Sequence, residues 1–290
     1  MAERPTGSTV PRRQLGRYLR ELRNQARLTA KAAAKALEWS DAKLWRIETG
    51  QTSLRSLDAE AMCRIYGASP DMTEALMGLA KETKARGWWH SYGDVIPERF
   101  DIFIGLEEAA SRIDWYETDL VPGLLQTEAY AREIISAAHE DEEEVEQRVQ
   151  LRIARQGLLT RTTEPPTLRV ALNEAVLRHS VGGSAVMGGQ LQHMAELSTL
   201  ANVKLRVIPF SAGLHQGVLS GQFGVLRFPA YGEREPEPPT VYADGYTGDL
   251  YLDKPAEVAR YDAAFANIWE SALTEEASRR LLVEMAGSHE

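Results

Sequence analysis

The first eighty residues place hydrophobic side chains with the period of an α-helix. Between Arg12 and Ala26 they recur every three or four positions, so one stripe of a helix is expected to be buried while the arginines face outward. Start and stop signals predict four more short helices, at residues 30–37, 41–48, 56–66 and 70–80. The residues predicted to cap them are Thr29, Ser40, Ser56 and Ser69.

The connection between the second and third of these helices is very short. Only Glu38, Trp39 and Ser40 separate them. Two short helices joined so closely are typical of a helix-turn-helix motif, in which the second helix can enter the major groove of DNA.

The pattern changes after residue 84. Helices are expected at 100–112, 128–136 and about 140–156, with a strand at 113–117. Beyond Pro165 the hydrophobic period shortens to two, which indicates strands. The predicted strands are 168–173, 203–208, 223–228, 240–244 and 250–252, and the remaining helices are 174–178, 186–200, 256–272 and 275–286. This order predicts an α+β domain with room for one parallel pair of strands.

The fold class is therefore multidomain: an all-α five-helix head followed by an α+β C-terminal domain. We expect a flexible N-terminus at 1–11, the helix-turn-helix domain at 12–84, a linker at 85–103 and the α+β domain at 104–286. Trp88, Trp89 and Tyr92 lie in the expected linker. Large aromatic residues at such a boundary either cover a domain junction or form a ligand cage, and we favour the junction.

Composition excludes several classes of protein. With 43% hydrophobic and 26% charged residues, the chain resembles ordinary globular proteins rather than disordered or fibrous ones. It has no long apolar run and no signal-peptide pattern, so we expect a cytoplasmic protein without a membrane partner. The single cysteine, Cys63, cannot form an internal disulfide.

Charge is distributed unevenly along the chain. The net charge is −9, yet residues 1–55 contain twelve Lys or Arg and five Asp or Glu, a net +7 that leaves −16 for the remainder. A basic head on an acidic body fits a module that binds phosphates, because Lys and Arg release counterions from a polyanion. The alternative is a solvated helix surface that is basic without binding anything.

Specific residues of the head match a known pattern. The matching pieces are Leu19 to Arg23, Leu28-Thr29, Ala34, Ser40 and Arg46 to Gly50. With them, the head resembles the XRE-type (lambda repressor-like) helix-turn-helix family, which implies a five-helix DNA-binding domain.

Two positions of the head depart from this family. Its frequent Gln at the start of helix two is Ala30, and its turn Gly is Glu38, which then has to accept a positive φ. The DNA sequence preference therefore cannot be transferred from relatives. A five-helix module that no longer binds DNA is the alternative.

Double-stranded DNA is the partner expected for the head. Lys43 and Arg46 are predicted to contact bases from the third helix. Trp45 either packs on a thymine methyl or a deoxyribose, or serves as a core or dimer residue. The other predicted groove residues are Ser40, Asp41 and Ala42, and the predicted phosphate contacts are Arg13, Arg17, Lys31 and Arg55.

The C-terminal part also carries matching pieces. They are Val121 to Thr127 with Tyr130-Ala131, Arg152 to Gln156, Asn173 to Arg178, Gln190-Leu191, and Val207 to Phe210 with Gly213 and His215. Residues 104–286 are similar to the uncharacterised domain that follows XRE heads in bacterial regulators often labelled antitoxin-like. Because members are often encoded beside a small protein, the resemblance implies a small partner protein.

Patterns for catalysis, cofactors and metals are weak. Gly182-Gly183-Ser184 is not a nucleophile elbow, which needs Gly both two positions before and two positions after the Ser. The histidines do not pair at metal-ligand spacing, so we expect no enzyme, no cofactor and no metal. A site built from Glu174, His215 and Asp244 stays conceivable, since strand ends and loops can converge.

These observations favour a homodimeric DNA-binding transcriptional regulator whose C-terminal domain receives a signal from a small-molecule effector or a partner protein. The alternatives are an antitoxin-like adaptor with autoregulatory DNA binding and an enzyme with a DNA-targeting head.

Overall fold

The structure is a computed structural model that describes residues 9–84, 87–92, 98–230, 236–245 and 248–288. It divides into two compact units, each treated by itself below. Met1–Ser91 and Glu98–Ala109 form the first, and Tyr92–Pro97 and Ala110–Glu290 form the second. The chain is therefore multidomain, as its sequence predicts. Among the described residues, none of the helices combines the length and hydrophobicity needed to span a bilayer.

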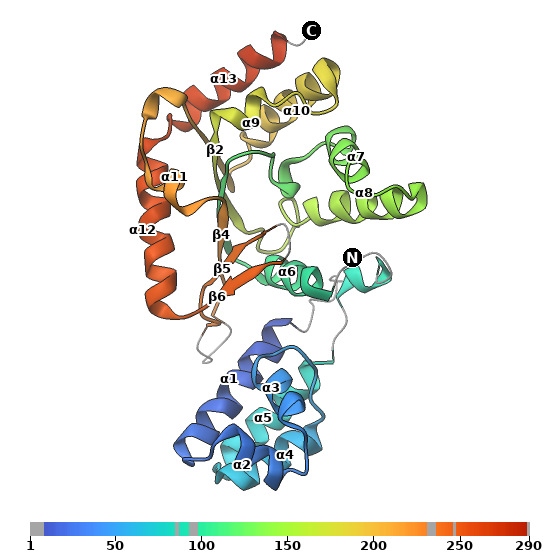
Figure 1. Cartoon of the computed structure of the whole chain (residues 1–290), viewed down its shortest axis with the longest axis vertical. Coiled ribbons are helices and arrows are strands. Elements are labelled where there is room, and N and C mark those ends of the chain that lie inside the picture. Colours follow the sequence, from blue (N-terminus) through green and yellow to red (C-terminus); the bar gives the residue numbers. More distant parts are fainter. Residues whose placement is uncertain (1–8, 85–86, 93–97, 231–235, 246–247, 289–290) are drawn as a thin grey trace. The chain divides into compact units, whose positions relative to one another are not determined.

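The first unit is all-helical, and its five predicted helices are confirmed. They are α1 (Thr9–Gln25), α2 (Ala30–Ala36), α3 (Asp41–Glu48), α4 (Ser56–Tyr66) and α5 (Pro70–Glu82) (Figure 1). Side chains from every helix meet in one core, which includes Leu19, Ala33, Leu44, Met62 and Leu76.

Two helix starts differ from the sequence expectation. Helix α1 begins at Thr9 rather than Arg12, and Thr9 and Val10 are buried. Of the N-terminus expected to be flexible, residues 1–8 lie outside the described residues. Ser56 is the first residue of α4 rather than its cap, because Arg55 occupies the cap position and the Ser56 hydroxyl donates to the carbonyl oxygen of Met77 instead.

A sixth helix, α6 (Glu98–Ala109), packs against α1 within the first unit. A Cβ atom on Gly105 would lie 2.0 Å from Oγ1 of Thr9, so only glycine permits this approach. The short 3-10 helix η1 (Trp88–Tyr92) adds Trp89, which is 1% exposed and whose indole nitrogen donates to Asp101 of α6 at 2.5 Å. Residues expected to be a linker thus contribute part of a packed element.

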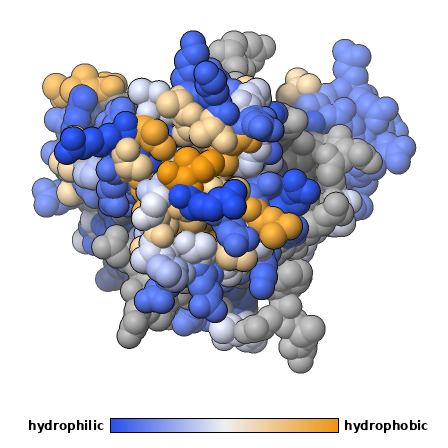
Figure 2. All heavy atoms as spheres, turned by 90° about the horizontal axis from the view of Figure 1, so that it is seen from below, coloured by the Kyte–Doolittle hydropathy of each residue, from blue (hydrophilic) through white to orange (hydrophobic). Residues whose placement is uncertain are grey.

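The surface of the first unit also carries hydrophobic side chains. Trp45, Leu57 and Met72 are exposed. On the face drawn in Figure 2, hydrophobic side chains gather near the centre and hydrophilic ones surround them.

The second unit is built on a six-stranded mixed sheet. Its strands are β1 (Arg112–Glu117), β2 (Thr167–Asn173), β3 (Val203–Ile208), β4 (Phe223–Arg227), β5 (Thr240–Ala243) and β6 (Leu250–Leu252). They lie in the order β3-β2-β1-β4-β5-β6. Both β1·β2 and β2·β3 are parallel, so there are two parallel pairs where the sequence left room for one. The reason is that the helices between these strands return the chain to the same end of the sheet.

Helices cover both faces of this sheet. They are α7 (Glu128–Ser136), α8 (Glu142–Gln156), α9 (Glu174–Arg178), α10 (Gly183–Leu197), α11 (Gln216–Ser220), α12 (Pro255–Ser271) and α13 (Glu275–Gly287), with 3-10 turns at Gly123–Leu125 and Phe210–Ala212. In Figure 1, α12 follows one face, while α7 and α8 lie beyond the other. Helix α11 is the one α-helix of the described residues that the sequence pattern did not predict.

One buried carboxylate of the sheet is paired with several arginines. Asp114 of β1 is 2% exposed and forms ion pairs with Arg112, Arg169 and Arg227, the closest being 2.7 Å to Arg227. The edge of β3 is also covered, because the amide of Val207 donates to the Ser278 hydroxyl at 2.9 Å and its carbonyl accepts from Leu273.

Candidate nucleic-acid interface

Helices α2 and α3 each begin with a side-chain cap. The Thr29 hydroxyl accepts from the amide of Ala32 at 3.1 Å, and the Ser40 hydroxyl accepts from the amide of Lys43 at 3.2 Å. Both caps were predicted and are confirmed. They satisfy amides that would otherwise lack partners in the first turn and fix the point at which each helix starts.

The turn between α2 and α3 requires a left-handed residue. Glu38 has a φ of 56°, as its place in the turn predicts. The amide of Trp39 donates to the carbonyl of Ala34, and the amide of Glu38 donates to that of Lys35, which is the Schellman arrangement of a helix end. This arrangement ends α2 abruptly and turns the chain into α3.

One side of α3 is left open to solvent. Leu44 and Ile47 are buried, as their spacing predicts. The residues exposed on the other side are Asp41, Ala42, Trp45 and Arg46. Because Trp45 is 57% exposed, the interpretation of this residue as a core residue is wrong. A DNA-contacting role or a role in a dimer stays open for it.

Helix α3 is anchored to α1 by a contact between backbones. A Cβ atom on Gly16 would lie 2.4 Å from the carbonyl oxygen of Ile47, so the two helices approach at a distance that only glycine allows. Sequence reasoning missed this residue, although a glycine inside a strongly periodic helix is a signal of close approach.

A buried ion pair adds a second anchor. The Arg23 guanidinium donates to both carboxylate oxygens of Glu48, at 2.6 and 2.9 Å, and to the carbonyl of Leu28 at 2.8 Å. The bonds to Glu48 raise the pKa of Arg23. Sequence reasoning also missed this pair. Its signal is Glu48 on the inner stripe of α3, one position after the buried Ile47.

Lys43 is less free than its predicted role assumes. Its side chain is half-buried, and Nζ lies 3.6 Å from the centre of the Trp39 ring. A cation over an aromatic face is attracted to the ring quadrupole, so Lys43 is held beside the turn. Arg46, which is exposed, is the cation of α3 with the freer side chain.

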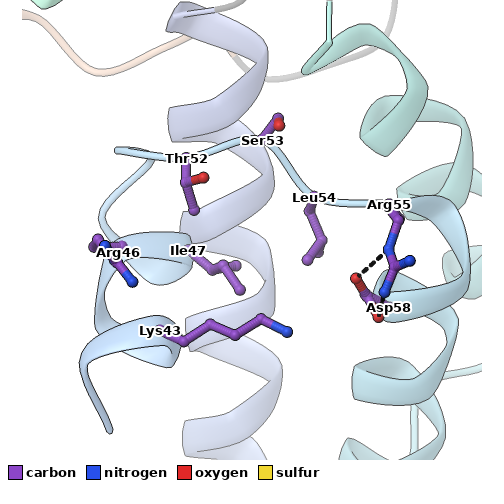
Figure 3. Close-up of a pocket in the computed structure, with 8 residues that line it drawn as sticks. All are labelled: Lys43, Arg46, Ile47, Thr52, Ser53, Leu54, Arg55 and Asp58. Carbon is purple, nitrogen blue, oxygen red and sulfur yellow. Dashed lines mark hydrogen bonds and ion pairs between the residues drawn. The ribbon is translucent and has the colours of Figure 1, made fainter. Parts of the chain in front are cut away.

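A shallow basic depression lies beside α3. It has a volume of about 370 Å³. Its lining, shown in Figure 3, consists of Lys43, Arg46, Ile47, Thr52, Ser53, Leu54, Arg55 and Asp58. Arg55 is exposed, and its Nε donates to Asp58 at 3.0 Å, which holds the guanidinium beside the start of α4. The lining thus contains three cations and two hydroxyl groups together with the carboxylate of Asp58.

The remaining predicted phosphate contacts lie on α1 and α2. Arg13 lies next to the end of α3, since a Cβ atom on Gly50 would lie 2.7 Å from Cα of Arg13. The guanidinium carbon of Arg17 lies 5.9 Å from the centre of the Tyr18 ring. Lys31 is exposed in the first turn of α2. Contact of these residues with DNA stays a prediction.

The residues of the conceivable catalytic site have separate partners. Glu174 accepts from the amide of Phe210, Nδ1 of His215 accepts from the amide of Gly217, and Asp244 accepts from Gln222. Burial lowers the pKa of His215. Within the described residues, no group of three or more His, Cys, Asp or Glu side chains could hold a metal ion.

One further carboxyl group has an unusual environment. Glu117, at the end of β1, is 9% exposed and accepts from the indole nitrogen of Trp115 at 2.7 Å. Burial raises the pKa of Glu117 to about 8, and the negative charges of Asp244 and Asp119 raise it as well. Glu117 is therefore largely protonated at neutral pH.

Two family models match the chain. A model described as a domain of unknown function (DUF5753) matches residues 100–284, and a model described as a helix-turn-helix domain matches residues 14–76. Neither description states an antitoxin role. No curated protein and no solved structure matches the chain significantly. The helix-turn-helix match covers the residues that build the α2–α3 site, which indicates a DNA-binding regulator.

Proposed function

The chain belongs to the family defined by the domain of unknown function DUF5753, and from this premise together with its helix-turn-helix domain we propose that it is a transcriptional regulator that binds double-stranded DNA sequence-specifically. In this proposal, α3 enters the major groove and the second unit transmits a signal to the DNA-binding unit.

The observation that carries the proposal is the open side of α3. The Ser40 cap and two contacts with α1 fix this helix, yet Trp45 and Arg46 extend from it into solvent. The guanidinium of Arg46 suits a bidentate contact with guanine. Lys31 and Arg55 flank the site as phosphate contacts, which would fix the register without reading sequence.

The DNA-binding form is proposed to be a homodimer. One recognition helix reads only a few base pairs, so a second copy bound about one helical turn away, at ~34 Å, raises both affinity and specificity. The operator would then have two-fold related half-sites.

The second unit is proposed to receive the signal, either from a small molecule or from a small protein encoded nearby. A ligand that binds only the folded unit stabilises it, so metabolites and neighbouring-gene proteins can be compared by the melting temperature of the full chain. The proposal includes no catalysis, because Glu174, His215 and Asp244 each bind a different neighbour.

The test is a selection of bound duplexes from a random DNA pool with the full chain. We expect an enriched motif with two related half-sites, and we expect Arg46→Ala to lose part of that motif. A Lys81→Ala variant is the matched control, because Lys81 is an exposed cation at the end of α5 and is assigned no role in DNA binding. If the selection enriches no sequence motif and the chain binds all duplexes alike through charge, sequence-specific binding is contradicted.

A further inference from the structure

The segment 209–221, which we name the α11 loop, exposes an unusual number of hydrophobic side chains. Phe210 is 60% exposed, Leu214 79%, Val218 60% and Leu219 72%. These four residues lie within ten positions of the chain, all in the second unit. Scattered exposed hydrophobic residues are normal, whereas a contiguous group marks an interaction surface.

Two hydrogen bonds hold the α11 loop to neighbouring helices. The amide of Phe210 donates to Oε2 of Glu174 at 2.9 Å, and the amide of Gln216 donates to Oδ1 of Asn267 on α12 at 2.9 Å. In Figure 1, α11 lies beside α12, in agreement with their close contact. The loop is therefore tied to α9 at Phe210 and to α12 at Gln216, on both sides of Leu214.

The centre of the α11 loop is anchored in the sheet. His215 is buried, its ring meets the Tyr116 ring edge-on, and its Nδ1 accepts from the amide of Gly217 at 3.1 Å. A Cβ atom on Gly217 would lie 2.5 Å from the Tyr116 ring, so the backbone rests directly on that side chain. The hydrophobic side chains are thus presented by a preorganised backbone, which reduces the ordering cost of binding.

The area of this surface fits a protein interface. The four side chains expose on the order of 500 Å² of apolar surface, more than half of the ~800 Å² that each partner buries in a standard-size interface. Ions of both signs lie at its border, since Arg178 pairs with Glu174 and lies 5.9 Å from the Phe210 ring centre. A border with both signs can face a copy of itself without like-charge repulsion.

We propose that the α11 loop is the surface through which two copies of this chain associate. A rigid apolar surface that is exposed in every copy of the chain needs a partner present at the same concentration as the chain. A second copy of the chain meets that condition. A two-fold interface buries the same residues on both copies, which doubles the area covered. This inference rests on the proposed function in one respect, because two half-sites require two DNA-binding units.

The test compares oligomeric states of the full chain by sedimentation without DNA. We expect wild type at about 10 µM to have twice the 32.3 kDa mass of one chain. The double variant Leu214→Glu with Leu219→Glu should sediment as a monomer, its dimer dissociation constant rising at least about 100-fold. Leu57→Glu is the matched control, because Leu57 is also 72% exposed but lies on α4 of the first unit.

Two readouts separate this interface from loss of folding and from the DNA-binding proposal. Circular dichroism should be unchanged in the double variant, and the single variant Leu214→Ser serves if the double variant does not fold. Binding to a DNA probe with one half-site should also be unchanged, while the advantage of a two-half-site probe disappears.

Several outcomes would overturn the inference. The first is that wild type sediments as a monomer. The second is that the double variant of the α11 loop is folded and still sediments as a dimer. The third is that Leu57→Glu, rather than the α11-loop variant, dissociates the dimer. If the masses follow expectation but no protein binds any DNA probe, the interface stands and the proposed DNA-binding function fails.

Discussion

Single residues on the open side of α3 and around it differ in what they can contribute to DNA binding. Arg46 projects from the last turn of α3, whereas Lys31 lies in the first turn of α2. We expect Arg46→Ala to lose about 1–3 kcal/mol of binding free energy on the selected site and to relax preference at one base position. Lys31→Ala should weaken binding to all sequences and reduce the salt slope by about one.

Titrations of specific and random duplexes at several salt concentrations measure this difference. Equal losses on both kinds of DNA for Arg46→Ala would assign Arg46 to the phosphates.

The Arg23–Glu48 pair illustrates the effect of burial on an ion pair. Removing the charge of Glu48 leaves a buried guanidinium uncompensated, so Glu48→Gln should lower the free energy of unfolding by about 2–4 kcal/mol. The matched control is Asp58→Asn, which breaks the pair with the 71%-exposed Arg55 and should lower the free energy of unfolding far less. Urea unfolding followed by circular dichroism compares the two. If Glu48→Gln and Asp58→Asn lower the free energy of unfolding by similar amounts, burial does not determine how much an ion pair contributes to stability.

Glu117 predicts a dependence of stability on pH. Its pKa of about 8 in the folded chain lies above its ordinary value of 4.5, so the folded state binds the proton more tightly. The contribution to stability is therefore complete below pH 4.5 and is lost as the pH rises to about 8. Glu117→Gln keeps an acceptor for Trp115 without the titration and should be more stable than wild type at about pH 8.5.

Thermal unfolding at about pH 5 and pH 8.5 tests this expectation. The exposed Glu140→Gln is the control and should follow wild type at both values. If the melting temperatures of Glu117→Gln and wild type differ by the same amount at both pH values, the predicted pH dependence is contradicted.

At the scale of elements, the ends of helices decide how the first unit turns. Glu38 and Gly67 occupy equivalent left-handed positions after α2 and α4, with φ values of 56° and 74°. A non-glycine residue there costs about 1 kcal/mol, so Glu38→Gly should raise the free energy of unfolding by about 0.5–1 kcal/mol. Gly67→Ala should lower it by about 1 kcal/mol, although a Cβ atom there meets nothing within 4 Å.

Denaturant unfolding of both variants measures the two effects. The prediction requires that the two substitutions change the free energy of unfolding in opposite directions. A loss of stability in Glu38→Gly would mean that the Glu38 side chain contributes more than its backbone strain costs.

At the scale of the whole molecule, α6 extends the first unit beyond its five predicted helices. Arg12 of α1 donates to the carbonyl of Thr83, and burial lowers its pKa while the nearby charge of Asp101 raises it. Trp89 is covered in the same region. We therefore expect a fragment of residues 1–109 to melt at a higher temperature than a fragment of residues 1–84.

Asp101→Ala in the longer fragment should remove part of that gain, because Asp101 accepts from the indole of Trp89. Melting followed by circular dichroism provides the measurement. Equal melting temperatures for both fragments would show that α6 adds nothing to the unit.

The sequence by itself determined the local features of this protein. These features follow from interactions between residues a few positions apart. They are the helix periods, the caps at Thr29 and Ser40, the left-handed residue at Glu38 and the outward direction of Arg46. Such interactions are encoded in short windows and can be derived without knowing the fold.

Tertiary structure alone decided the features that join distant residues. Arg23 and Glu48 are 25 positions apart, Gly16 meets Ile47 across two helices, and the α11 loop becomes a surface only because Tyr116 and Asn267 hold its backbone. The strand order of the sheet and its second parallel pair also depend on contacts between residues far apart in the sequence. These contacts depend on which elements pack together, and the hydrophobic effect that packs them is non-directional, so a local pattern specifies that a face is buried but not against what.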